Sequence, residues 1–166
     1  PNHLEQRLQE EPKIIILGGS HSAFSVAHYF LHHQKNYNFK TQGISIWCNE
    51  KPKIYFPTKQ DALASCYDDF TDQDFCPITN KLYRLAGLRM DGRELYMNML
   101  GLNNTTKENR VCLNLFSEND TALVKELETT TLIVTALGYT FNMIPIFDDS
   151  GNQLRFIGEE TGHWVN

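Results

Sequence analysis

The sequence predicts an α/β fold with three layers and a mainly parallel sheet, from two observations near its amino terminus. Residues 14–17 form a continuous apolar run, Ile-Ile-Ile-Leu, which ends at Gly18-Gly19. A short run of this kind is typical of a strand covered on both faces, as in a parallel sheet. Apolar residues then recur at helical spacing over 20–33, before a second apolar run at 43–47. This order predicts a right-handed βαβ crossover, the unit of a Rossmann-like fold.

Residues 1–12 are polar and favour a helix that Pro12 ends. Residues 50–90 are rich in Pro, Asp and aromatics. We interpret them as an irregular insertion at the carboxyl edge of the sheet, with one short helix near 58–67. A further helix is predicted over 91–100, where Asp91 and Glu94 have the spacing of a capping box.

Two more apolar runs, at residues 111–116 and 130–136, predict the third and fourth strands of the sheet. Residues 144–147 and 153–157 flank the segment Asp-Asp-Ser-Gly-Asn. Two short apolar runs around a glycine-containing loop predict a C-terminal β-hairpin.

The chain has 166 residues, which suits a single domain with a core of its own. Its formal charge of −5 gives no reason to expect nucleic acid or an anionic membrane as a partner. No apolar run approaches the ~20 residues of a membrane span.

The four cysteines are scattered without a CxxC pair, which favours reduced thiols and a cytoplasmic location. Because the chain begins at Pro1 instead of Met, we expect it to be a piece of a longer protein.

The turn between the first strand and the first helix has the strongest functional pattern in the chain. In the G-x-G-x-x-G/A pattern the first glycine permits a tight turn, the second lets backbone approach a pyrophosphate, and the last small residue lets helix and strand pack closely. Gly18 and Ala23 fit the first and third positions, and Ser20 departs from the second. With Gly19, His21 and Ser22 they form a candidate cradle for phosphate at a helix amino terminus.

An acidic residue that holds the adenosine ribose is expected at the end of the second strand. Asn49 and Glu50 stand there. Glu50 favours NAD, whereas Lys51 and Lys53 suit the 2′-phosphate of NADP. The sequence leaves both cofactors open.

Two segments together resemble a known family. Residues 14–23, Ile-Ile-Ile-Leu-Gly-Gly-Ser-His-Ser-Ala, resemble the NAD(P)H-binding turn of class B and N-hydroxylating flavin monooxygenases. Residues 132–139, Leu-Ile-Val-Thr-Ala-Leu-Gly-Tyr, are similar to a later strand-end motif of that family, written ATGY, with Leu137 in place of its Thr. The resemblance adds Gly138 and Tyr139 to the candidate cofactor-binding residues. Residues 74–79 and 83–94 are similar to other FAD/NAD(P)-binding oxidoreductase-like proteins.

The resemblance implies that residues 1–166 are one NAD(P)-binding module of a longer FAD-dependent oxidoreductase. In that family FAD occupies a separate glycine-rich turn, and no second turn of this kind occurs in the sequence. We therefore expect FAD to be held by another part of the parent protein, and the chain alone not to catalyse oxidation.

Several other residue patterns have a functional and a structural interpretation. Arg84, Arg89 and Arg93 include a candidate phosphate ligand, Arg89, although nearby carboxylates offer ordinary ion-pair partners. His21 is expected either as a neutral hydrogen-bonding residue beside the phosphate or as a turn residue facing solvent. His28 and His32 lie four apart without an evident third ligand, so we expect no metal.

Two alternatives to dinucleotide binding stay open. The Ser20 and Leu137 departures are compatible with a Rossmann-like interaction domain that has lost its nucleotide. A weaker alternative is another adenosyl ligand on the same turn, such as S-adenosylmethionine, although no accompanying substrate site is evident.

Overall fold

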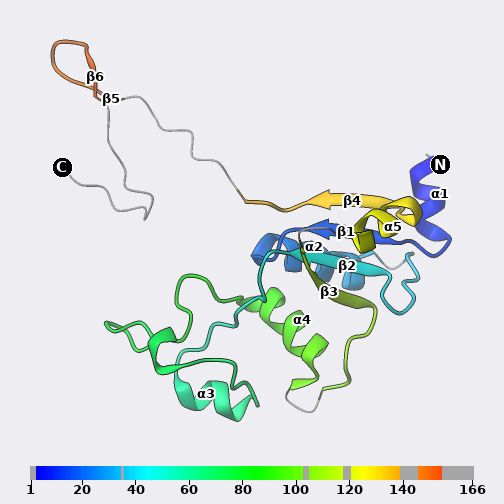
Figure 1. Ribbon diagram of the computed structural model, residues 1–166, viewed down its shortest axis with the longest axis horizontal. Coiled ribbons are helices and arrows are strands. Elements are labelled where there is room, and N and C mark those ends of the chain that lie inside the picture. The colour runs from blue at the N-terminus through cyan, green and yellow to red at the C-terminus, as the bar shows by residue number, and fades with distance from the viewer. Residues whose placement is uncertain (1–2, 35, 103–104, 118–120, 139–145, 155–166) are drawn as a thin grey trace.

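The computed structural model describes residues 3–34, 36–102, 105–117, 121–138 and 146–154. Its centre is a four-stranded sheet, shown in Figure 1, in which every pair of neighbouring strands is parallel. The strands are β1 (Ile14–Leu17), β2 (Ile44–Cys48), β3 (Val111–Leu115) and β4 (Leu132–Thr135). Their order across the sheet is β3-β2-β1-β4, which matches the first four strands of the doubly wound Rossmann order.

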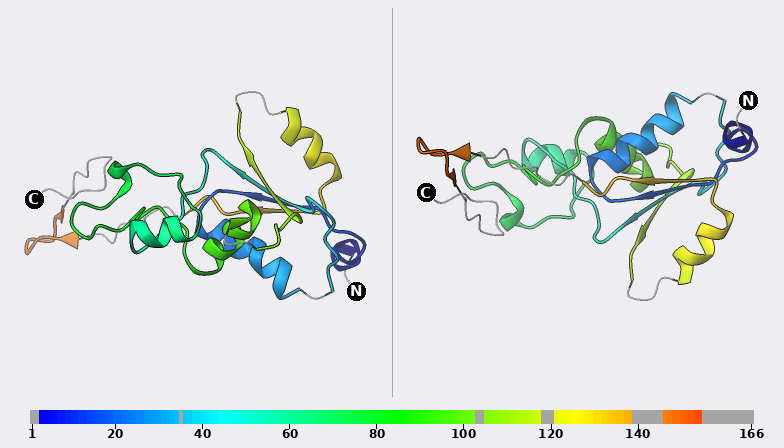
Figure 2. Two further views of the ribbon diagram at one scale, coloured as in Figure 1. Left: turned by 90° about the horizontal axis from the view of Figure 1, so that it is seen from below. Right: turned by 90° about the horizontal axis from the view of Figure 1, so that it is seen from above.

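The helices cover the two faces of this sheet unequally. Helices α2 (His21–His32) and α4 (Met90–Leu100) lie on one face, and α5 (Thr121–Thr129) lies on the other (Figure 2). This arrangement follows from right-handed crossovers, because the strand order reverses direction after β3 and the return to β4 passes over the opposite face. The α/β fold with three layers predicted from the sequence is thus confirmed.

The main core lies between the sheet and the α2–α4 layer. Ile14, Ile16, Ile44 and Ile46 are completely buried there. Phe24 of α2 meets Tyr96 of α4 edge to face, with 5.3 Å between the ring centroids. The face of the sheet toward α2 and α4 is therefore apolar, and β1 is buried on both of its faces, as its uninterrupted apolar run predicted.

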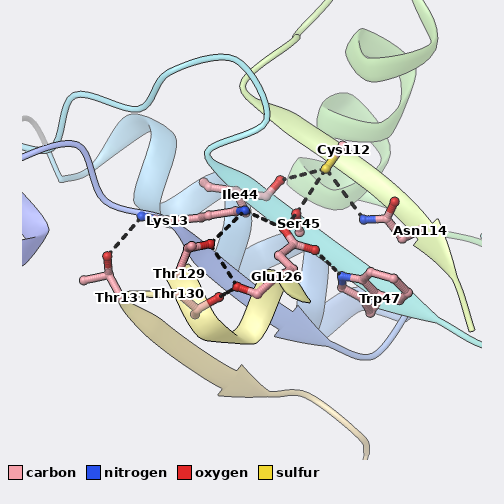
Figure 3. Close-up of polar contacts among 10 residues, drawn as sticks. All are labelled: Lys13, Ile44, Ser45, Trp47, Cys112, Asn114, Glu126, Thr129, Thr130 and Thr131. Atoms are coloured by element: carbon pink, nitrogen blue, oxygen red, sulfur yellow. Dashed lines mark hydrogen bonds and ion pairs between the residues drawn. The ribbon is translucent and has the colours of Figure 1, made fainter. Parts of the chain in front are cut away.

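A polar cluster fastens α5 to the opposite face of the sheet (Figure 3). The carboxylate of Glu126 accepts hydrogen bonds from the hydroxyl of Ser45 and, at 2.9 Å, from the indole N–H of Trp47. The ammonium of Lys13 lies 3.7 Å from the same carboxylate. Ser45 is the one buried polar residue of the described core, and this contact satisfies it.

The insertion at residues 50–90 extends the main apolar core beyond the end of the sheet. It contains α3 (Lys59–Ala64) and a single 3₁₀ turn, η1 (Asp72–Asp74). Isolated bridges pair Ile54 with Leu88 and Phe56 with Leu82, and all four side chains are buried. The predicted insertion is therefore a packed extension at the carboxyl end of β2, with the short helix that the sequence indicated.

Two short elements complete the described chain. Helix α1 (His3–Gln9) precedes β1, as residues 1–12 predicted. Strands β5 (Ile146–Phe147) and β6 (Gln153–Leu154) pair antiparallel around the glycine-containing loop, which confirms the C-terminal hairpin. The remainder of the two predicted hairpin runs, at 144–145 and 155–157, lies outside the described residues. No described helix combines the length and apolarity that crossing a bilayer requires.

The predicted capping box at Asp91 and Glu94 is wrong. Helix α4 begins one residue earlier, at Met90, with Arg89 at the N-cap and no side-chain cap. Asp91 therefore lies inside the first turn, where its charge suits the helix dipole, and Glu94 lies beyond that turn. The sequence also gave no indication of α5, which occupies the connection between β3 and β4.

Candidate functional site

The turn after β1 is built around a backbone conformation that only glycine tolerates. Gly18 has φ +130°, and a Cβ placed there would lie 2.2 Å from the carbonyl oxygen of Ala136. That carbonyl belongs to the segment leaving β4, so the turn and the end of β4 are in direct backbone contact. The N–H of Gly18 donates to the Trp47 carbonyl at 2.8 Å, which ties the turn to β2 as well.

The second glycine of the turn is required for a different reason. A Cβ at Gly19 would lie 2.5 Å from the Cβ of Cys48 at the end of β2. Cys48 is buried, and desolvation raises the pKa of its thiol, so the group stays protonated and uncharged near neutral pH. Gly19 therefore lets the backbone pass close over the carboxyl end of β2.

The start of α2 leaves donors available. Ser20 is the N-cap residue, but its side chain makes no capping hydrogen bond. Its carbonyl accepts from the N–H groups of Ala23 and Phe24, which begin the helical ladder. No hydrogen bond of the described chain uses the N–H groups of Gly19 to Ser22, and the positive end of the helix dipole lies behind them. Such an array is suited to an anion.

Ala23 has the packing role that the third position of the motif requires. Its side chain is completely buried where α2 begins to cross the sheet. A larger residue would push the helix away from the strands, and the helix amino terminus would move with it. The small residue thus fixes the distance between the turn and the sheet.

His21 connects the starts of two helices. Its Nε2 atom accepts a hydrogen bond from the backbone N–H of Arg89, at 3.0 Å. Arg89 is the N-cap of α4, so this contact positions α4 against the first turn of α2. An accepting Nε2 requires the neutral form of the ring, or tautomer, that carries its proton on Nδ1. His21 therefore accepts a hydrogen bond from protein backbone while its side chain stays exposed, and its predicted role beside a phosphate stays a prediction.

A crevice of about 460 Å³ opens at the carboxyl ends of the four strands. This volume lies within the range of ligand-binding pockets. Of the residues predicted for the site, the structure brings six together in its lining: Gly18, Gly19, Ser20, His21, Asn49 and Glu50. They come from the turn after β1 and from the end of β2, so the two halves of the predicted motif meet in one place.

The other predicted residues do not line the crevice. Ser22 and Ala23 lie within the first turn of α2. The guanidinium of Arg89 lies 4.3 Å from the ring centroid of Tyr55 and donates to the Arg84 carbonyl, outside the crevice lining. Gly138, with φ +92°, follows the lining residue Leu137. Tyr139 lies outside the described residues.

The structure adds lining residues that sequence patterns did not single out. Phe116 follows β3, and Leu85 and Ala86 come from the insertion. Cys48 also lines the crevice, close to Gly19. From the sequence we expected the insertion to lie at the carboxyl edge of the sheet. That expectation applied to all of residues 50–90 and did not indicate which of them reach the crevice.

Two lysines line the crevice, and both have partners in the insertion. The ammonium of Lys51 is 2.6 Å from the carboxylate of Asp69, and this hydrogen bond lowers the pKa of Asp69. The ammonium of Lys53 lies 5.3 Å from the ring centroid of Tyr83. No hydrogen bond or ion pair in the described chain engages the carboxylate of Glu50, which is exposed.

A second, larger cavity of about 920 Å³ lies between α3 and α4. Asp61, Asp91, Arg93 and Glu94 supply its charged lining. The first N–H groups of α4, at Met90 and Asp91, also lack hydrogen-bond partners in the described chain, but the acidic majority of this lining opposes a phosphate. Within the described residues, no group of three or more potential metal ligands gathers in this cavity or elsewhere.

Comparison with protein-family models, with curated proteins and with solved structures finds no match to this chain.

Proposed function

We propose that this chain binds the pyrophosphate of a nicotinamide dinucleotide, NAD or NADP, in the crevice at the carboxyl ends of its strands. In this proposal it is the NAD(P)H-binding module of an FAD-dependent, monooxygenase-like oxidoreductase and is not active alone. The main support for this proposal is the position of the glycine turn. The turn and the free amino terminus of α2 lie where the strand order reverses, between β1 and β4. In open α/β sheets this switch point is where ligands bind.

The residues present fit a dinucleotide. The N–H groups of Gly19 to Ser22 and the uncommitted Ser20 hydroxyl suit the pyrophosphate oxygens, and Glu50 suits ribose hydroxyls. The absence of a Cβ at Gly18 and Gly19 lets the backbone stay close to both neighbouring strands. When bound, a reduced nicotinamide supplies hydride for transfer to an acceptor. The chain's own contribution is to hold and orient that donor.

The residues do not fit FAD as a second cofactor. The sequence has one glycine turn that opens a helix, and the dinucleotide proposal already uses it. We therefore derive no chemical step through flavin in this chain. The resemblance at residues 14–23 and 132–139 supports a partner region that holds FAD and receives the hydride. The four free thiols fit a reducing, cytoplasmic compartment.

Calorimetric titration with NADH and NADPH tests this proposal. We expect saturable binding of at least one nucleotide, and Ser20→Asp should abolish it. An aspartate at an N-cap preserves or improves helix stability, but it places a negative charge against the phosphate. Ser25→Asp, on the exposed side of the same helix, is the matched control and should bind as the wild type does.

Two results would contradict the proposal. One is the absence of binding up to millimolar nucleotide by a chain whose circular dichroism shows that it is folded. The other is equal binding by the Ser20→Asp and Ser25→Asp variants, because the ligand would then occupy some other surface.

A second candidate function is that of an interaction domain without a nucleotide. Leu85 and Leu137 both line the crevice and are strongly exposed, at 92% and 74%, which favours it, since exposed apolar residues gathered at one site are typical of protein contacts. Restored nucleotide binding in Ser20→Gly, when the wild type shows none, would support this alternative.

A further inference from the structure

We propose that the crevice selects NADH over NADPH, with Glu50 against the ribose of the adenosine half and Phe116 against its adenine. This inference rests on the proposed dinucleotide function and adds which nicotinamide cofactor is taken. The sequence left that choice open between the acidic residue and the two lysines after β2. The structure distinguishes them by their partners.

The strand order sets the orientation of the dinucleotide. The pyrophosphate site lies on the turn after β1, with β2 and β3 on one side of it and β4 on the other. In folds of this order the acidic residue after β2 bonds the adenosine ribose, so the adenosine half extends toward β2 and β3. The crevice wall on that side contains Asn49, Glu50 and Phe116. The nicotinamide half then extends toward Ala136 and Leu137.

Glu50 is the uncommitted charge on the adenosine side. Its carboxylate is exposed, lines the crevice and has no hydrogen-bond or ion-pair partner in the described chain. A carboxylate accepts hydrogen bonds from the 2′- and 3′-hydroxyls of an unmodified ribose. A 2′-phosphate, by contrast, brings about two further negative charges against it near neutral pH. The carboxylate of Glu50 therefore favours the binding of NADH over that of NADPH.

The cationic side chains near Glu50 interact with other residues. Lys51 is paired with Asp69, and Lys53 lies over the ring of Tyr83. Both members of the Lys51–Asp69 pair are roughly half exposed, so its free energy is small, and its release can be tested by substitution. Arg89 stacks on Tyr55 instead of facing the crevice. The arginine that commonly accommodates a 2′-phosphate is thus missing from the described wall of the crevice.

Phe116 supplies an apolar face beside Glu50. Its N–H donates to the Cys48 carbonyl at 2.9 Å, which continues the β2–β3 ladder past the end of β3 and fixes the residue at the crevice wall. Its ring packs on the buried ring of Trp47, with 5.7 Å between the centroids. Bases stack on aromatic rings held in this way, and adenine has the required face.

The test compares NADH and NADPH by calorimetry at one ionic strength. We expect the wild type to bind NADH about tenfold more tightly, the effect of one unfavourable charge contact. Glu50→Gln should reduce this preference to about threefold or less. Asp69→Asn should strengthen NADPH binding alone, because it releases Lys51. Glu128→Gln removes an equivalent exposed charge from α5, on the other face of the sheet, and should change neither affinity.

A second pair of variants separates adenine contact from ribose recognition. Phe116→Ala should weaken both nucleotides by about fivefold or more, the effect of one lost stacking contact, and leave their ratio unchanged. Phe116→Leu retains apolar volume against Trp47 and should weaken both less. Urea unfolding followed by circular dichroism verifies that each variant is folded.

The outcomes separate this inference from the function on which it rests. NADPH binding at least as tight as NADH binding, or an unchanged ratio in Glu50→Gln, would overturn the inference while dinucleotide binding stands. Unchanged affinities in Phe116→Ala would overturn the assigned adenine contact. Absence of binding of both nucleotides would overturn the inference and the proposed function together.

Discussion

At the scale of single residues, the glycine turn depends on two positions that exclude a side chain. At Gly18 the tight turn after β1 brings the backbone against the carbonyl of Ala136. At Gly19 the requirement arises from the side chain of Cys48 on another strand. A contact between residues distant in sequence becomes visible only when the strand order is known.

Gly18→Ala tests the first of these requirements. The variant meets both an unfavourable φ of +130° and a Cβ contact of 2.2 Å with the Ala136 carbonyl oxygen. We expect a loss of about 3 kcal/mol in the free energy of unfolding, from backbone strain and local displacement of β4. Urea unfolding measures it.

The matched control for this substitution is Gly101→Ala. Gly101 also has a positive φ, +70°, at the end of α4, but its nearest neighbour would lie 4.0 Å from the new Cβ. It should lose only about 1 kcal/mol, the usual cost of a left-handed residue with a side chain. Equal losses in the two variants would show that the turn does not press against β4.

Cys76, in the insertion, offers a pH-dependent test of local structure. Hydrogen bonds from the Thr79 side chain and from backbone N–H groups, together with one from Arg84, lower the pKa of this thiol to about 6. The thiolate is the reactive form. We expect the rate of alkylation of Cys76 by iodoacetamide to rise through pH 6 in the folded protein. In urea the rise should move to about pH 8.5, the ordinary thiol value.

Mass spectrometry of the alkylated peptide follows this reaction site by site. Arg84→Gln removes one donor to the sulfur and should shift the midpoint upward. A midpoint that is the same in folded and unfolded protein would mean that the Thr79 and Arg84 contacts are not formed in solution.

At the scale of elements, most of the strands and helices follow from sequence periodicity, and α5 does not. The strands of the parallel sheet are apolar runs that β-sheet burial explains directly. Helix α5 has no fully buried residue, and its best covered contact with the sheet is the carboxylate of Glu126. Leu123, Val124 and Leu127 do have helical spacing, but the segment is short, and Val124 and Leu127 are exposed.

Glu126→Ala tests that attachment. It leaves the hydroxyl of Ser45 and the indole N–H of Trp47 without their acceptor beneath α5. We expect a loss of about 2 kcal/mol or more in the free energy of unfolding, because two partly buried donors lose their partner. Glu128→Ala, an exposed carboxylate on the same helix, should change it by less than about 0.5 kcal/mol. A Glu126 effect no larger than that of Glu128 would contradict the role given to this cluster.

At the scale of the whole molecule, the decisive property is the order of the strands. Sequence predicted a parallel sheet but not that β4 lies beside β1, opposite β2. Tertiary packing places β4 beside β1. The turn after β1 and the end of β4, which are far apart in the sequence, therefore line one crevice. The turn after β1 and the end of β4 meet because Gly18 lies directly under Ala136. The candidate site was therefore predictable in the turn after β1 and in the two residues that follow β2, and not in Cys48, Phe116 or the insertion.

The cavity between α3 and α4 is larger than the crevice in which we place the ligand. The volume of about 920 Å³ between α3 and α4 exceeds the volume of about 460 Å³ at the strand ends. We assign the nucleotide to the smaller crevice because unused backbone donors and a helix dipole converge there, away from the acidic lining of the larger cavity. The position of a bound dinucleotide thus tests the account more directly than its affinity does.

The most direct measurement is an NMR titration of the isotopically labelled chain with NADH, followed through its backbone amides. We expect the largest shifts at the N–H groups of the turn, Gly19 to Ser22, and smaller ones at Glu50 and Phe116. Amides of Asp61 and Arg93, which line the cavity between α3 and α4, should move little. Shifts concentrated at Asp61 and Arg93, or none at the turn with NADH in millimolar excess, would contradict the proposed binding site.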